Sequence, residues 1–191
     1  MKQSQLKNHK MKKIKILGLF ILAIAGGNSF AQMKMVGGAA MYPTKNIVEN
    51  AVNSKDHTTL VAAVKAAGLV STLESKGPFT VFAPTNEAFD ALPAGTVQTL
   101  LKPENKTKLT SILTYHVVPG KLSSEELMKM VKMHNGKASL KTVQGDDLYL
   151  SMKGKHLMIT DETGNTADIT IADVNQSNGV IQVVDKVLLP K

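Results

Sequence analysis

The sequence predicts an α+β domain, with helices in the first half and mostly antiparallel strands in the second half. Up to about residue 134, apolar residues recur at helical spacing. Beyond residue 136, short runs rich in β-branched residues alternate with glycine-containing turns. A chain of 191 residues can bury a core large enough for one such domain. We therefore expect a single folded unit over residues 44–191.

The clearest helix is predicted over residues 109–117. Its apolar face is made by residues at intervals of three and four: Leu109, Ile112, Leu113, His116 and Val117. Pro119 and Gly120 follow and end it. Ser123 and Glu126 have the spacing of a capping box and predict the start of another helix.

Four helices and one strand are predicted before residue 109. Three of the helices are expected near residues 47–52, residues 60–67 and Leu73. The strand covers residues 79–82, and Thr85 is placed to cap a helix that follows it.

Five strands are predicted in the second half, over residues 140–143, 148–150, 156–160, 169–172 and 180–184. The dipeptide Asn178-Gly179 predicts a tight turn between the last two, with a positive φ angle at Gly179. Residues 161–165 resemble a calcium loop superficially but lack its glutamate, so a hairpin turn is expected there.

Residues 1–31 have the three parts of a secretory signal peptide: a lysine-bearing start, a short apolar run, and small residues at Ser29 and Ala31. The apolar run is shorter than the roughly 20 residues that span a bilayer. The alternative is an uncleaved membrane anchor. The sequence leaves open whether Met1 or Met11 is the initiator. We expect an exported protein, periplasmic or extracellular, with no membrane span in its mature form.

The segment that follows, residues 32–43, contains three methionines, two adjacent glycines and Pro43. It shows neither helical nor strand periodicity, so it is predicted to be a flexible leader.

Composition excludes several classes of protein. Cysteine is absent, which excludes disulfides, thiolate metal sites and a cysteine nucleophile. The formal charge is +8, but six of the 23 basic residues lie in residues 1–31, which leaves 17 against 15 acidic residues. There is no arginine, and nucleic-acid binding typically uses arginine and stacked aromatic residues. We therefore expect no nucleic-acid partner.

Three stretches together resemble the fasciclin (FAS1) domain family. Residues 77–89 read GPFTVFAPTNEAF, residues 113–120 read LTYHVVPG, and residues 172–190 contain ADV followed by SNGVIQVVDKVLLP. They occur in the family's order and at domain-sized spacing. Gln182 departs from the pattern, because many members carry a histidine there.

The resemblance implies a β-sandwich-like wedge of mostly antiparallel strands, flanked by several helices from the N-terminal half. It also implies a binding or adhesion module rather than an enzyme, with a cell-surface, matrix or polysaccharide partner. We expect a monomer without a cofactor. The alternative function is a periplasmic protein that binds a small molecule or a metal; an enclosed pocket with convergent polar groups would favour that alternative.

Two pairs of residues are candidates for partner binding. Tyr115 and His116 correspond to the family's Tyr-His motif, which has been linked to integrin binding in animal relatives. His116 falls on the apolar face of its helix, which predicts a core position, whereas Tyr115 lies off that face and is expected to be partly exposed. Thr85 and Asn86 could bind a polar ligand, but capping of the helix that follows is their simpler role.

Metal-binding and catalytic motifs have little support. Met128, Met130 and Met133 point in different directions around a helix and do not converge on a copper site. There is no GxSxG, HExxH or glycine-rich phosphate loop. The sequence thus predicts no metal site and no catalytic residues.

Overall fold

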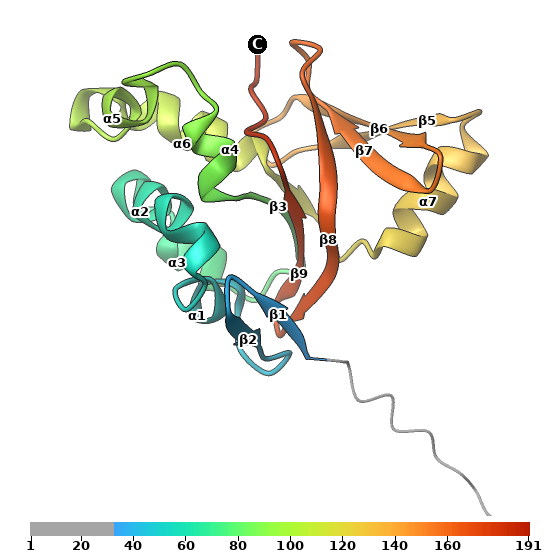
Figure 1. The fold of residues 1–191 in the computed structure, drawn as a ribbon, viewed down its shortest axis with the longest axis horizontal. Helices are drawn as coiled ribbons and strands as arrows, with labels where there is room; N and C mark the ends of the chain where they lie inside the picture. The colour runs from blue at the N-terminus through green and yellow to red at the C-terminus, as the bar shows by residue number, and fades with distance from the viewer. Residues whose placement is uncertain (1–32) are drawn as a thin grey trace, which may run out of the picture. The chain divides into compact units, whose positions relative to one another are not determined.

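The structure, a computed structural model, describes residues 33–191 (Figure 1). The helices are α1 (Ile47–Ala51), α2 (Thr58–Ala67), α3 (Val70–Glu74), α4 (Asn86–Asp90), α5 (Thr96–Leu100), α6 (Lys106–Tyr115) and α7 (Ser124–Met133), with the 3-10 turns η1 (Lys55–His57) and η2 (Pro103–Asn105). The strands are β1 (Lys34–Val36), β2 (Ala39–Met41), β3 (Phe79–Pro84), β4 (Val117–Pro119), β5 (Lys137–Lys141), β6 (Asp147–Lys153), β7 (His156–Thr160), β8 (Thr166–Gln176) and β9 (Gly179–Val184). The predicted signal peptide lies outside the described residues.

Seven strands form one sheet, in the order β4-β3-β9-β8-β7-β6-β5. All neighbours are antiparallel except β3 and β9, which run parallel. The two outermost strands approach each other at one end, because the Val143 N–H donates to the Val117 carbonyl at 2.7 Å. The predicted α+β class with a mostly antiparallel sheet is confirmed.

The core has two parts, one on each face of β3 and β9. The helix-side cluster lies against α1 to α6 and includes Val81, Leu109 and Ile181. The strand-side cluster lies between α7 and strands β5 to β8 and includes Phe82 and Leu150. Figure 1 shows α1 to α6 on one side of β3 and β9, and α7 beside β5 and β6. Both central strands are therefore apolar on both faces, as parallel pairs covered on two sides usually are.

The segment predicted to be a flexible leader is structured from β1 onward. Strands β1 and β2 form a hairpin, and Val36 and Met41 are 4% and 3% exposed within the helix-side cluster. Asn50 holds the following turn: its side chain accepts from the Tyr42 N–H (3.0 Å) and donates to the Tyr42 carbonyl (2.8 Å). Three-residue strands are too short to show a period, which explains why the sequence does not reveal them.

The turn between β8 and β9 differs from its prediction by one residue. Gln176 pairs with Gly179, so the two loop residues are Ser177 and Asn178. Gly179 is the first residue of β9, and it is not among the residues with positive φ. Position 179 requires glycine for another reason: a Cβ atom there would lie 2.1 Å from the Phe79 carbonyl oxygen on the neighbouring strand.

Asn178 is a buried connection between elements rather than an exposed turn residue. Its side-chain amide donates to the carbonyls of Leu73 (2.7 Å) and Ser75 (2.8 Å), and its oxygen accepts from the Ile47 N–H (3.0 Å). The β8–β9 turn thereby fixes the end of α3 and the start of α1.

Candidate functional site

The Tyr-His pair lies where α6 ends and β4 begins. The predicted helix stops two residues early: Tyr115 is the last helical residue, His116 caps the helix, and Val117 opens β4. His116 is 3% exposed, which confirms its predicted core position. Its Nδ1 lies 2.8 Å from the Ile112 carbonyl, and its Nε2 accepts from the Leu188 N–H at 3.0 Å.

These two contacts determine the protonation of His116. Because the Leu188 N–H can only donate, Nε2 carries the lone pair and Nδ1 carries the proton. Burial lowers the pKa of the imidazole to about 4, although the Ile112 carbonyl and the charge of Asp161 oppose the shift. His116 is therefore a neutral ring that holds the segment after β9.

Tyr115 is fully buried, which corrects the expectation that it is partly exposed. The ring packs in the strand-side cluster. Its hydroxyl donates to the Asp147 carbonyl (2.8 Å) and accepts from the Glu162 N–H (3.1 Å). Because α6 ends between the two clusters, the face opposite its main apolar stripe is also covered. Burial raises the pKa of the phenol, so it stays protonated.

Thr85 and Asn86 join α4 to its neighbours. Thr85 caps α4, and its hydroxyl oxygen accepts from the Ala88 N–H at 3.4 Å, as predicted. The Asn86 side chain accepts from the Thr59 N–H (3.0 Å) and donates to the Lys55 carbonyl (2.8 Å). Asn86 thus ties α4 to η1 and to the start of α2.

Gln182, where many family members carry histidine, is fully buried and fully hydrogen-bonded. Its amide donates to the Leu122 carbonyl and to Asp173 Oδ1, both at 3.1 Å, and its oxygen accepts from the Asp173 N–H at 2.9 Å. Asp173 also accepts from the Ser124 backbone at 2.6 Å, at the start of α7. Burial alone would raise the pKa of Asp173, but hydrogen bonds from Ser124 and Gln182 outweigh it and lower the pKa. The glutamine serves as a support for α7.

The surface that Tyr115 supports consists of two loops. Asp147 begins β6, Glu162 lies in the β7–β8 turn, and the Asp147 N–H donates to the Glu162 carboxylate at 3.3 Å. Asp146 and Gln144 belong to the same loop as Asp147, and all four side chains are half-buried. We call these four residues the acidic loop surface. No motif in the sequence distinguished them, because residues 144–147 and Glu162 are distant in the sequence and meet only in the folded chain, through Tyr115 and through the contact between Asp147 and Glu162.

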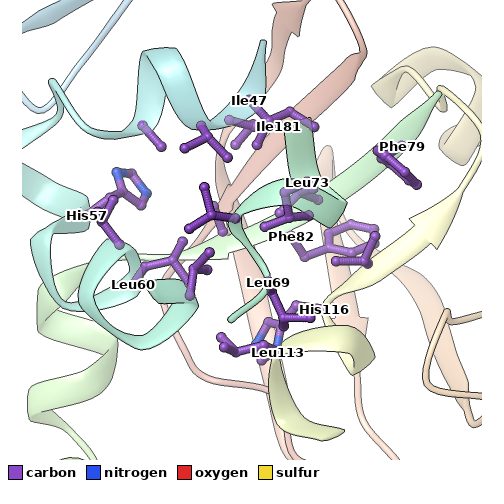
Figure 2. Close-up of a pocket in the computed structure, with 18 of the residues that line it drawn as sticks. Ile47, His57, Leu60, Leu69, Leu73, Phe79, Phe82, Leu113, His116 and Ile181 are labelled. Carbon is purple, nitrogen blue, oxygen red and sulfur yellow. The ribbon is translucent and has the colours of Figure 1, made fainter. Parts of the chain in front are cut away.

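An apolar cavity of about 90 Å³ lies on the other side of the core (Figure 2). Buried walls include Ile47, Leu60, Leu73 and Ile181. Natural interiors contain few such voids, and by the usual volume relation one of this size costs about 2 kcal/mol of stability. The cavity is therefore a feature that packing alone does not explain.

His57 lies in the wall of this cavity and is 4% exposed. Its Nδ1 pairs with Ser54 Oγ at 2.9 Å, and its Nε2 has no hydrogen-bond partner within residues 33–191. Burial lowers the pKa of the ring, while the nearby Ala83 carbonyl opposes the shift without forming a hydrogen bond to Nε2. At neutral pH the cavity wall is thus uncharged at this point.

Within residues 33–191, no three His, Asp or Glu side chains lie close enough together to hold a metal ion. In the same part of the chain, no helix has the length and apolarity needed to cross a membrane.

The fold and these hydrogen bonds define a compact α+β domain in which buried polar side chains hold loops in place. The Fasciclin domain family matches residues 55–190. The chain belongs to the fasciclin family, in agreement with the resemblance in its three sequence blocks.

Two relatives and one solved structure illustrate the match. Protein sll1483 of Synechocystis sp. is 45% identical over 174 residues, covering 91% of this chain and 89% of the relative. The cell surface glycolipoprotein MPB83 of Mycobacterium bovis is 35% identical over 160 residues, covering 81% of this chain and 64% of the relative. A FAS1 domain pair from the insect cell adhesion molecule Fasciclin I has the same fold, with a TM-score of 0.67 at 18% identity, over 76% of this chain and 51% of that chain.

Proposed function

We propose that this protein is an exported, monomeric binding module, not an enzyme, that recognises a cell-surface, matrix or polysaccharide partner. Family membership supports the binding role, and one relative is a cell surface glycolipoprotein. The observation that carries the proposal is the use of the Tyr-His pair as a support: both side chains are buried and both hold backbone of neighbouring loops.

The contact surface in this proposal is the acidic loop surface. A partner outside the folded domain cannot touch the rings of Tyr115 and His116, so these residues act by positioning loops. Carboxylate and amide groups on the loops can accept hydrogen bonds from sugar hydroxyls or from a polar protein surface. Thr85 and Asn86 are proposed as a second, smaller polar contact, since both remain half-buried rather than fully buried.

Substitutions that keep side-chain shape test this surface. Asp146→Asn and Glu162→Gln remove charge, while the amide oxygen at residue 162 can still accept from the Asp147 N–H. Binding of purified protein to intact cells of the source organism, to protein arrays and to polysaccharide arrays should weaken. Glu74→Gln and Glu104→Gln, exposed acids on α3 and η2, are matched controls and should bind normally.

Two results would count against the proposal. If both pairs of variants bind equally well, the contact lies on another surface. If the wild-type protein binds no cell, protein or polysaccharide surface, the module function itself fails.

Export is tested separately, by intact-mass analysis of the protein from its native host. The proposal expects an N-terminus at Gln32. A cytoplasmic protein that retains residues 1–31 would contradict export, and a membrane-bound one would support the uncleaved anchor.

A further inference from the structure

The mouth of the apolar cavity has a different character from its walls. The accessible lining residues come from several elements. Lys65, Thr72 and Val143 are exposed, and the half-buried ones are Val48, Ala51, Val61, Leu69, Val70, Phe79 and Thr114, whereas the other walls are buried. Most of these residues belong to α1, α2, α3 and the end of α6, so the mouth of the cavity lies among these helices. Figure 2 shows His57 and Leu60 on one side of the cavity, and Leu69, Leu113 and His116 close together on another side.

Charge is distributed unevenly along this lining. Among the described residues that line the cavity, Lys65 on α2 is the only one with a formal charge at neutral pH, and its side chain is exposed. A lysine in this position can lay its alkyl stem on apolar surface while its ammonium group stays in water. The two histidines in the lining are neutral at pH 7, since burial lowers the pKa of each.

We propose that this cavity binds the hydrocarbon chain of a medium-chain fatty acid, with the carboxylate at the mouth beside Lys65. The apolar wall excludes an ionised group from the interior, because an unpaired charge there would lose its hydration. A cation at the mouth of an apolar cavity matches an amphiphile with a negative head. This site is separate from the acidic loop surface.

The volume limits the ligand. An engineered protein cavity of about 150 Å³ holds benzene. A cavity of about 90 Å³ thus holds a short part of a chain, and further carbons would lie along the half-buried residues of the mouth. Two long acyl chains of a phospholipid do not fit, so the proposed ligand is a free acid with a single chain, and octanoate is the probe.

The first test compares ligands of the same length on the full-length protein. Octanoate, 1-octanol and octylammonium share one chain and differ in head charge. Calorimetry should show saturable 1:1 binding, tightest for octanoate and weakest for octylammonium. Raising the salt concentration should lower the affinity for octanoate, because salt screens an exposed charge pair. The affinity for 1-octanol should not change.

The second test changes the protein. Lys65→Gln should lower the affinity for octanoate about twofold to fivefold, the range expected for an exposed ion pair. The affinity for 1-octanol should not change. Lys108→Gln, an exposed lysine on α6 outside the cavity lining, is the matched control and should have no effect. Val64→Phe adds bulk to the cavity wall and should abolish binding of all three ligands. If Val64→Phe does not fold, the ligand comparison and Lys65→Gln still decide.

Three outcomes would overturn the proposal. Absence of saturable octanoate binding at millimolar concentration removes the site. Equal affinity for octanoate and octylammonium, with no effect of Lys65→Gln, removes the role of the cation. Unchanged binding in a folded Val64→Phe variant would place the ligand elsewhere. None of these outcomes bears on binding at the acidic loop surface, which is tested with other variants.

Discussion

Several residues in this protein are required by a contact with backbone that is distant in the sequence. Gly179 lies beside Phe79, 100 positions earlier, in the parallel pairing of β3 and β9. Any Cβ at Gly179 would meet the Phe79 carbonyl oxygen at 2.1 Å, a distance that requires the strands to move apart. The close approach of two backbones, not turn geometry, requires glycine here.

Gly179→Ala should therefore lower the free energy of unfolding by about 3 kcal/mol or more, at the upper end for overpacked sites. Gly95→Ala is the matched control. Gly95 also needs a special backbone, with φ of 81°, but has no atom within 4 Å of its Cβ position, so its cost should be about 1 to 2 kcal/mol. Urea denaturation of both variants measures the difference. Equal losses would mean that the β3–β9 approach relaxes easily.

Alanine substitutions at Tyr115 and His116 are expected to lower the free energy of unfolding by similar amounts, although the sequence predicts only His116 to be buried. Tyr115→Ala should cost about 3 to 5 kcal/mol, because it removes a buried ring and two hydrogen bonds. His116→Ala should cost about 2 to 4 kcal/mol. Tyr42→Ala, at a residue that is 44% exposed, should cost less than about 1 kcal/mol. A Tyr115 variant that unfolds in urea like wild type would refute the buried position.

At the scale of elements, the chain after β9 is held by two groups from different parts of the fold. The imidazole of His116 accepts from the Leu188 N–H, and Asp161 accepts from the Leu189 N–H at 2.9 Å. The same aspartate organises the β7–β8 turn through the Thr163 N–H (3.0 Å) and the Asn165 N–H (2.9 Å). The C-terminal segment, α6 and the β7–β8 turn are thus coupled.

This coupling predicts a pH dependence. The pKa of His116 is about 4 in the folded protein and near its ordinary value of 6.5 in the unfolded chain. Between these values the unfolded chain binds more protons, so the stabilisation is complete above pH 6.5 and is lost as the pH falls toward 4. Between pH 7 and pH 5 the free energy of unfolding should fall by about 2 kcal/mol from this residue.

Urea denaturation at pH 7 and pH 5 measures this change, and His116→Gln provides the control, because glutamine does not titrate. The pKa of His57 is also lowered, so a smaller loss of the same sign should remain in that variant. An unchanged slope in His116→Gln would assign the pH dependence to other groups.

At the scale of the molecule, two hydrophobic clusters share the same central strands. Val81 and Ala83 of β3 face the helix-side cluster, while Phe82 between them faces the strand-side cluster. Strand β9 alternates in the same way, with Val183 on one side and Val184 on the other. Because β3 and β9 contribute side chains to both clusters, displacing these strands would disrupt both clusters.

We therefore expect the two clusters to unfold together. Ile112→Ala in the helix-side cluster and Leu150→Ala in the strand-side cluster should each cost about 2 to 5 kcal/mol. In each variant, the unfolding curves from far-ultraviolet circular dichroism and from tyrosine fluorescence should coincide. Two separated transitions in either variant would show that the clusters are independent.

Periodicity and capping residues predicted most of the elements of the fold. These elements follow from local patterns, in which the residues involved lie within a few positions of one another. Examples are the apolar stripe of α6, the capping box of α7, the N-cap at Thr85 and the succession of strands after residue 136. Local patterns of this kind determine which segments become helices or strands, because each depends on side chains three or four positions apart in a helix or two in a strand. The burial of His116 follows from the same rule.

Tertiary structure decided the features that depend on residues distant in the sequence. The burial of Tyr115 depends on the second cluster, the hairpin at residues 34–41 on contact with the helix-side core, and the glycine at position 179 on the Phe79 carbonyl. The side-chain amide of Asn178 is hydrogen-bonded to backbone of α1 and α3. The cavity beside His57 is lined by residues from several helices and strands. A sequence pattern records only neighbours along the chain, whereas each of these features comes from packing between different elements of the fold.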